Sequence, residues 1–240
     1  TGWEDWVPPA LRRLPLGTRG VLLINLLVFV VGAAFPDHPM LGSRAAQHAL
    51  AIQPSGAFKD PPISLLKESL RAVTHAFVHG SALHLFFNMM SLVNIGQIIE
   101  TTIGTAPFLV LCAQLLGAYS SLLFAIAAAA AVNPQLSFRS LDAKMVGFSG
   151  VLFGLFTVQA LAEPPGSTGI NRLFFLLVAQ YLLFPSSSLL GHSVGIAAGF
   201  AYSRGYLSWS DASRSLILRI EKSLHAFDGV VRSRPGSWLV

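Results

Sequence analysis

The sequence places one hydroxyl between two glycines in the apolar stretch Val146-Gly147-Phe148-Ser149-Gly150-Val151-Leu152-Phe153-Gly154. A second apolar stretch, Leu189-Leu190-Gly191-His192-Ser193-Val194-Gly195, contains a histidine. Burying an ionisable side chain inside a membrane is costly, so an intramembrane histidine indicates a functional site. A serine with that histidine as its partner predicts nucleophilic catalysis within a bilayer, with Ser149 and His192 as the catalytic pair.

The composition is that of a membrane protein. Hydrophobic residues make up 53% of the 240 residues, charged residues 11%, and the mean hydropathy is +0.61, whereas a soluble domain carries roughly 25% charged residues. We therefore predict an all-α polytopic membrane protein, built as one helix bundle. The net charge is +5, but the basic residues lie mostly outside the apolar runs, where they set topology and contact lipid headgroups. The bilayer is thus an expected partner, and nucleic acid is not.

Six apolar runs are long enough, or nearly long enough, to cross a membrane, for which about 20 residues are needed. The fifth run is short and is flanked by loop-like Pro, Gly and Ser residues. We expect spans over 18–35, 81–103, 106–132, 146–162, 170–184 and 188–207. They would form one membrane-embedded domain over 1–207, with a long loop at 36–80 and a tail at 208–240.

The distribution of Lys and Arg predicts that both termini are cytosolic, because this orientation puts ten of the 16 basic residues on the cytosolic side. Spans 2, 4 and 6 then enter from the opposite face. His84, Asn88, Ser149 and His192 lie early in these spans, so all four fall in one leaflet. The same convergence holds if the topology is inverted.

Small residues four apart form a flat helix face that lets two backbones approach closely. The fourth and sixth predicted spans both carry such a face, formed by Gly150, Gly154, Gly191, Gly195 and Gly199. If the two faces meet, the serine and the histidine come together, and the imidazole can take the hydroxyl proton during attack on a carbonyl. Each feature alone has a structural explanation: a serine bonded to a carbonyl one turn back, a packing or relay histidine, and plain helix packing.

His84 and Asn88 are four residues apart and share a helix face. Both can donate hydrogen bonds to a developing oxyanion; as an alternative, they could simply join helices. A zinc site built on His75 and His79 is disfavoured, because the sequence lacks the glutamate of an H-E-x-x-H motif and a nearby further ligand. Neither a metal nor a cofactor is expected.

A third catalytic residue is hard to identify. Asp142 lies seven residues before Ser149, in the preceding loop, while Glu100 and Glu163 fall at the far ends of their helices. We therefore interpret the pair as a Ser-His dyad. The G-x-S-x-G nucleophile elbow is also absent, since Gly150 follows the serine directly, and this excludes an α/β-hydrolase.

Taken together, these motifs resemble the rhomboid family of intramembrane serine proteases over about residues 65–207. Gly147-Phe148-Ser149-Gly150 is similar to the family's GxSG motif, and His192, Gly195 and Gly199 are similar to its HxxGxxxG motif. His79, His84 and Asn88 stand at the spacing of its His…His…Asn signature. One departure is that Leu70-Arg71 aligns with a frequent Trp-Arg pair.

The resemblance implies a six-helix rhomboid-like bundle with Ser149 as nucleophile and His192 as base. It implies an oxyanion hole formed by His84, Asn88 and the Ser149 backbone. The expected substrates are single-span membrane proteins whose helix unwinds locally, because an intact helix buries its carbonyls. The sequence around these motifs is most similar to the eukaryotic secretory-pathway branch of the family, which implies an endomembrane location in the ER or Golgi. Two other functions remain open, a catalytically silent escort for membrane proteins and a transporter that uses the histidines.

The tail at 208–240 differs in kind from the spans. Apolar residues recur there at helical spacing, with basic residues on other faces, which predicts a basic amphipathic helix. It could lie on the cytosolic membrane surface or pack against the bundle. Residues 232–236 are expected to be unstructured.

Overall fold

The computed structural model describes residues 13–36, 38, 43–58, 63–136, 139–164, 166–183, 188–207 and 211–228. Within these ranges the chain is helical and contains no β-strand, apart from one isolated antiparallel bridge between Ile52 and Met145. The predicted all-α fold is confirmed. The run 232–236 lies outside the described residues.

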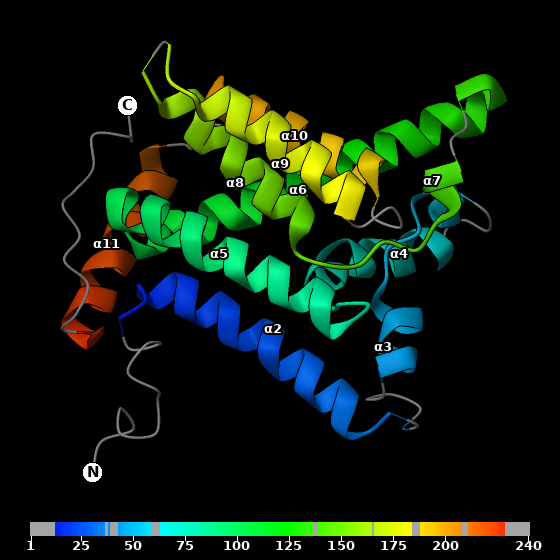
Figure 1. The fold of residues 1–240 in the computed structure, drawn as a ribbon, viewed down its shortest axis with the longest axis horizontal. Coiled ribbons are helices and arrows are strands. Elements are labelled where there is room, and N and C mark those ends of the chain that lie inside the picture. The colour runs from blue at the N-terminus through cyan, green and yellow to red at the C-terminus, as the bar shows by residue number, and fades with distance from the viewer. Residues whose placement is uncertain are drawn as a thin grey trace.

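A helix occupies each of the six ranges expected to cross the membrane (Figure 1). These helices are α2 (Leu16–Ala34), α5 (Ala82–Ile103), α6 (Thr105–Val132), α8 (Ser149–Ala162), α9 (Gly169–Leu183) and α10 (Leu189–Ser203). Among the described residues, α2, α5 and α6 are long and apolar enough to cross a membrane, while α8 and α9 are shorter apolar helices. α8 is central, because it packs against α5, α6, α9 and α10.

The fourth helix begins three residues later than the sequence predicts. Residue 146 was expected to be helical, but Met145 forms a two-bond bridge with Ile52 (2.8 and 3.1 Å), and Gly147 has φ +108°. A positive φ ends any helix continuing through that position. α8 therefore starts at Ser149, and an extended segment leads into it.

The sixth helix ends at Ser203, four residues before the expected boundary at 207. Gly205 follows with φ +78°, a left-handed conformation that commonly terminates helices.

The expected long loop between the first two spans folds largely into short helices. These are α3 (Ser43–Leu50), η2 (Pro54–Phe58), α4 (Ile63–Thr74) and η3 (His75–Phe77). They gather with α7 (Arg139–Asp142) at the end of the bundle where α5 begins (Figure 1). In α4, Ile63, Leu66, Leu70 and Val73 are exposed at the three- and four-residue spacing of one apolar helix stripe.

The tail helix α11 (Asp211–Asp228) packs against α6, at the end where α2 begins and α5 ends (Figure 1). Of the two placements considered for this segment, the structure shows one face packed on the bundle. Ile217 and Glu221 are buried in that contact. The Glu221 carboxylate accepts hydrogen bonds from the backbone N–H groups of Thr105 (3.0 Å) and Ala106 (2.5 Å). It thereby caps α6, whose first N–H groups have no partners within the helix.

We expect Glu221→Ala to lower the free energy of unfolding by about 1–3 kcal/mol, because it leaves two buried N–H groups of α6 unsatisfied. The measurement is thermal unfolding of the purified protein in detergent. Lys222→Ala is the matched control, since Lys222 is exposed on the same helix. Equal stability of both variants would contradict the capping role.

Candidate active site

The structure brings the predicted catalytic pair into hydrogen-bond contact. His192 Nε2 lies 3.1 Å from Ser149 Oγ, although the two residues are 43 positions apart in the sequence. Ser149 is the first residue of α8, and His192 lies in the first turn of α10. An imidazole with its hydrogen on Nδ1 can accept the hydroxyl proton at this distance.

The His192 ring is held by stacking on Phe153, with ring centroids 4.5 Å apart and planes 29° apart. Phe153 lies four residues after Ser149 on α8, so the two side chains share one helix face. The N-terminus of α10 is fixed as well, because Ser188 Oγ accepts the Gly191 N–H at 3.0 Å. The imidazole is thus oriented by packing and by the position of its helix.

Four of the five predicted packing glycines lie where α8 meets α10. A Cβ added at Gly195 would collide with the carbonyl oxygen of Gly150, and one at Gly199 would collide with that of Gly154. A Cβ at Gly154 would lie 3.3 Å from the Gly195 carbonyl oxygen. Backbone touches backbone at this crossing, which lets the serine and histidine side chains meet.

Gly191 has a different neighbour from the one expected. An added Cβ there would lie 3.0 Å from Tyr119 Oη and 3.2 Å from Ser188 Oγ. Gly191 is one turn before Gly195 on α10, and α8 begins too late to face it. Its close contacts are therefore with α6 and with its own helix cap.

The pair opens into a cavity of about 470 Å³. Its lining comes from the start of α5, from α6, from the extended segment before α8, and from α9 and α10. The lining residues include Ser81, His84, Tyr119, Lys144, Gly147, Ser149, Gln180 and His192. Polar groups from five separate segments therefore converge on one hollow, as is typical of a binding site.

His84 is one of these lining residues, and it lies directly against Gly147. An added Cβ at Gly147 would be 2.7 Å from His84 Cε1 and 2.9 Å from Nε2. A glycine is required at this position for two reasons: the backbone has a positive φ, and a Cβ would collide with the adjacent imidazole. It allows the His84 ring to reach the wall of the cavity near Ser149.

Asn88 is placed differently from His84. It is buried one turn further along α5, and its side-chain Nδ2 donates to the His84 carbonyl oxygen at 2.9 Å. It is not among the residues that line the cavity. Asn88 therefore supports the backbone that carries His84 in this structure.

The Ser149 backbone provides a donor at the start of α8. The first intrahelical bond there is Leu152 N–H to the Phe148 carbonyl at 3.1 Å, so the preceding N–H groups have no partner within the helix. They lie at the positive end of the helix dipole. A negative oxygen near Ser149 Oγ would be stabilised there.

The three acidic residues considered as a third catalytic residue beside Ser149 and His192 have other hydrogen-bond or ion-pair partners. Asp142 accepts from Ser55 Oγ at 2.7 Å, and Glu163 pairs with Arg172. Glu100 accepts from the N–H groups of Gly17 and Thr18 at the start of α2, at 2.7 and 2.6 Å. No carboxylate in the described part of the chain bonds to His192, so the geometry is that of a pair.

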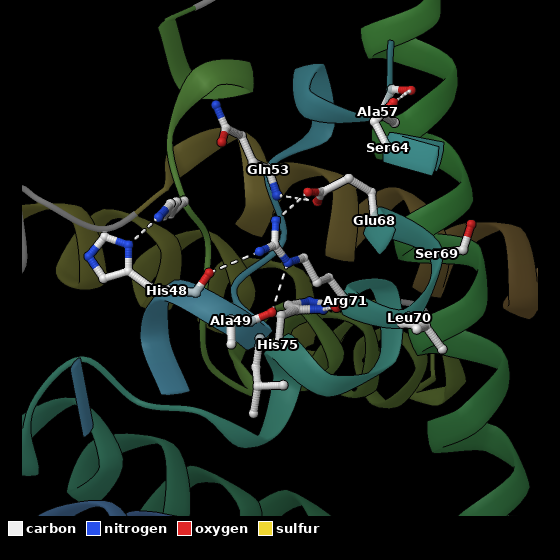
Figure 2. A network of polar contacts seen from close by, with 12 residues as sticks. His48, Ala49, Gln53, Ala57, Ser64, Glu68, Ser69, Leu70, Arg71 and His75 are labelled. Atoms are coloured by element: carbon white, nitrogen blue, oxygen red, sulfur yellow. Dashed lines mark hydrogen bonds and ion pairs between the residues drawn. The ribbon is translucent and has the colours of Figure 1, made fainter. Parts of the chain in front are cut away.

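A network of exposed and partly buried polar contacts joins the end of α3 to α4 (Figure 2). Arg71 donates to the carbonyls of Ala49 (2.8 Å) and His48 (3.0 Å) at the end of α3, and to Glu68 (2.5 Å). Glu68 also accepts the Gln53 N–H at 2.9 Å. A guanidinium suits this position because its fixed fork satisfies several acceptors at once.

His75 and His79 lie outside the helices expected to span the membrane. Burial lowers the pKa of His75 to about 4 and that of His79 to about 3, so both are neutral at pH 7. His75 Nδ1 bonds to the Arg71 carbonyl at 2.9 Å, while the His79 ring packs edge-on against His84 with centroids 5.1 Å apart. Over the described ranges, no group of three or more His, Cys, Asp or Glu is arranged to hold a metal ion.

Comparison with known families places this geometry in context. Residues 66–209 match the model of the Rhomboid domain, a stretch that contains the serine, the histidine and the cavity between them. The chain belongs to the rhomboid family. The resemblance drawn from its motifs is confirmed.

Several curated rhomboid proteins are similar to this chain. Rhomboid-like protein 15 of Arabidopsis thaliana is 33% identical over 163 residues, covering 64% of this chain and 40% of that protein. Rhomboid-like protein 14, mitochondrial, of the same plant is 32% identical over 181 residues, covering 70% and 54%. Rhomboid-type serine protease 2 of Saccharomyces cerevisiae is 26% identical over 250 residues, covering 97% and 84%. The chain thus spans about half the length of the two plant relatives.

Several residues that line or support the cavity of this rhomboid were not predicted from the sequence. Phe153 and Tyr119 were not singled out, yet one stacks on His192 and the other stacks on His75 with centroids 5.6 Å apart. A signal existed for Phe153 in its four-residue spacing from Ser149. None existed for Tyr119, Lys144 or Gln180, because they come from segments distant in the sequence.

Proposed function

We propose that this rhomboid-family protein is an intramembrane serine protease that cleaves single-span membrane proteins. The observation that carries the proposal is the 3.1 Å contact between His192 Nε2 and Ser149 Oγ at the floor of a polar cavity. His192 takes the hydroxyl proton as Ser149 Oγ attacks the scissile carbonyl carbon. It then returns that proton to the leaving amine. Water hydrolyses the acyl-enzyme with the same imidazole as base.

The tetrahedral intermediate places a negative charge on the former carbonyl oxygen. The Ser149 N–H at the start of α8 and the His84 ring on the cavity wall are the donors placed to stabilise it. We also propose Asn88 as a donor through the second N–H of its side-chain amide, because the first N–H donates to the His84 carbonyl oxygen. Such donors act mainly in the transition state, where the oxygen becomes fully charged.

We further propose that all six apolar helices lie in the bilayer, with both termini cytosolic. With 14 residues, α8 is about 21 Å long at 1.5 Å per residue, shorter than the roughly 30 Å hydrocarbon core. A helix this short can begin below the membrane surface, with its extended lead-in segment reaching upward. Water would then reach Ser149 from the non-cytosolic face through the cavity.

The substrate consistent with this site is a segment that can leave its helical conformation. The lining segment 143–147 and the facing residues of α9 and α10 leave room for an extended chain beside Ser149. Of the possible compartments, we propose the endomembrane system, which fluorescence of the tagged chain in cells would test against a mitochondrial marker.

Two other functions predict different outcomes. A silent escort would retain the fold but have an unreactive serine, and the hydrogen-bonded pair argues against that function. A transporter would need polar groups across the whole membrane, whereas here the cavity joins residues near the starts of α5, α8 and α10.

The test is labelling of the purified, liposome-reconstituted chain with a small fluorophosphonate, combined with cleavage of a single-span reporter protein. We expect labelling at Ser149 and cleavage within or next to the reporter's membrane segment. Both should persist in EDTA and phenanthroline, because serine chemistry with a histidine base needs no metal. Absence of labelling in folded protein would overturn the proposal.

We expect His84→Ala to lower kcat by about 10–10³-fold with little change in KM, because the lost donor acts in the transition state. Asn88→Ala should lower kcat less, since Asn88 does not line the cavity. Single-turnover rates and melting temperatures are measured on the same samples. Normal rates with reduced stability would remove both residues from the oxyanion hole and leave them a purely structural role.

A further inference from the structure

The cavity around Ser149 contains one unbalanced charge. Its described lining includes two histidines, several hydroxyls and one formally charged side chain, Lys144. Lys144 lies five residues before Ser149 on the extended segment that leads into α8. Among the described residues that line the cavity none is acidic, so this lining provides no carboxylate to pair with Lys144.

Lys144 is held in place by the loop network. Its ammonium contacts His48 Nδ1 at 2.6 Å, in the last turn of α3. The end of that helix is fixed by Arg71, which binds the carbonyls of His48 and Ala49 and is itself bonded to Glu68 (Figure 2). The ammonium is therefore linked through the His48 ring and the end of α3 to the polar network around Arg71.

The charge of Lys144 is not neutralised within the described part of the chain. Its side-chain contact there is with Nδ1 of the His48 ring and not with a carboxylate. Asp142 is only two residues away, but it accepts a hydrogen bond from Ser55. A cation that has no carboxylate partner can gain one from a substrate without first breaking an ion pair.

A second, smaller hollow lies on the other side of the same residue. It has a volume of about 160 Å³ and is lined by Gln47, His48, Ala51, Lys144 and Val146. Lys144 and Val146 line both hollows. A substrate chain that extends from Ser149 along residues 144–146 would therefore come close to Lys144.

We propose that Lys144 determines specificity by selecting substrates with an acidic side chain close to the scissile bond, where an aspartate or glutamate meets the ammonium between the two hollows. This inference rests on the proposed protease function. An exposed ion pair of this kind is expected to favour an acidic over an isosteric neutral residue by about threefold to fivefold, at the upper end of what such pairs contribute. The preference should weaken as salt is added, because the pair is partly exposed.

The test uses peptidyl phosphonate probes that react covalently with the serine. In a neutral parent peptide, one position at a time is substituted with Asp or with Asn. The labelling rates of the two probes are then compared as an Asp/Asn ratio. At one position or two adjacent positions, the wild-type ratio should exceed about three and should fall in 1 M salt. In Lys144→Met it should approach one, and in Lys144→Glu it should invert. Because the ratio is taken within each variant, a general loss of reactivity cancels.

Lys67→Glu is the matched control, since it makes the same charge change on exposed α4, away from the cavity. It should retain the wild-type ratio. A ratio near one at every position in wild type, or a ratio unchanged in Lys144→Glu, would overturn the inference while leaving the protease function intact. Failure of the small fluorophosphonate to label folded wild-type protein would instead overturn the protease function, and with it this specificity.

Discussion

Ser149→Ala and His192→Ala should each abolish proteolysis, with a loss of about 10⁴–10⁶-fold in kcat and a protein that remains folded. In the proposed mechanism the serine supplies the nucleophile, and the histidine, at 3.1 Å, is the group placed to remove its proton. The two act as one unit, so the double variant should be little worse than either single variant. The measurement is single-turnover cleavage of a membrane reporter by purified protein.

The controls for this pair use reactivity and stability together. Ser149→Ala should not react with a fluorophosphonate, while His192→Ala should react far more slowly than wild type. Ser149→Ala should melt close to the wild-type temperature, whereas His192→Ala should melt somewhat lower, because removing the buried ring leaves a cavity against Phe153; both should remain folded. Substantial cleavage by purified Ser149→Ala would rule out the serine mechanism.

Gly195→Leu and Gly199→Leu should inactivate the enzyme without removing any catalytic group. Even a Cβ at these positions would collide with the backbone of α8, at the carbonyls of Gly150 and Gly154. Backbone cannot rotate away as a side chain can, so α10 must shift. A displacement of about 1 Å at reacting groups can cost 10²-fold, and we expect at least that loss, together with reduced stability.

Gly117→Leu is the matched control for the packing argument. Gly117 lies within α6, is exposed, and has no atom within 4 Å of an added Cβ. This variant should keep its activity and melting temperature, while the graded series Gly195→Ala and Gly195→Leu should lose both progressively. Wild-type activity in either Gly195→Leu or Gly199→Leu would show that close approach of the two backbones is unnecessary.

The local sequence determined which segments are helical and which faces carry glycine, serine and histidine. Those properties follow from hydrophobicity and three- to four-residue spacing, which act within one segment. That His84, Ser149 and His192 lie together was also predicted from the sequence, because alternate spans enter a membrane from the same face, and all three line one cavity. Even the family could be inferred, since its motifs are short and contiguous.

Tertiary structure decided where α8 begins, what fills the long loop and which residues meet at the cavity. Ser149 starts a helix because Met145 pairs with Ile52, more than 90 residues earlier, and because Gly147 accommodates the His84 ring. The placement of α11 through Glu221 and the contact between Lys144 and His48 likewise join segments far apart in the chain. Spacing along one helix cannot encode them, because they depend on how several helices pack at once.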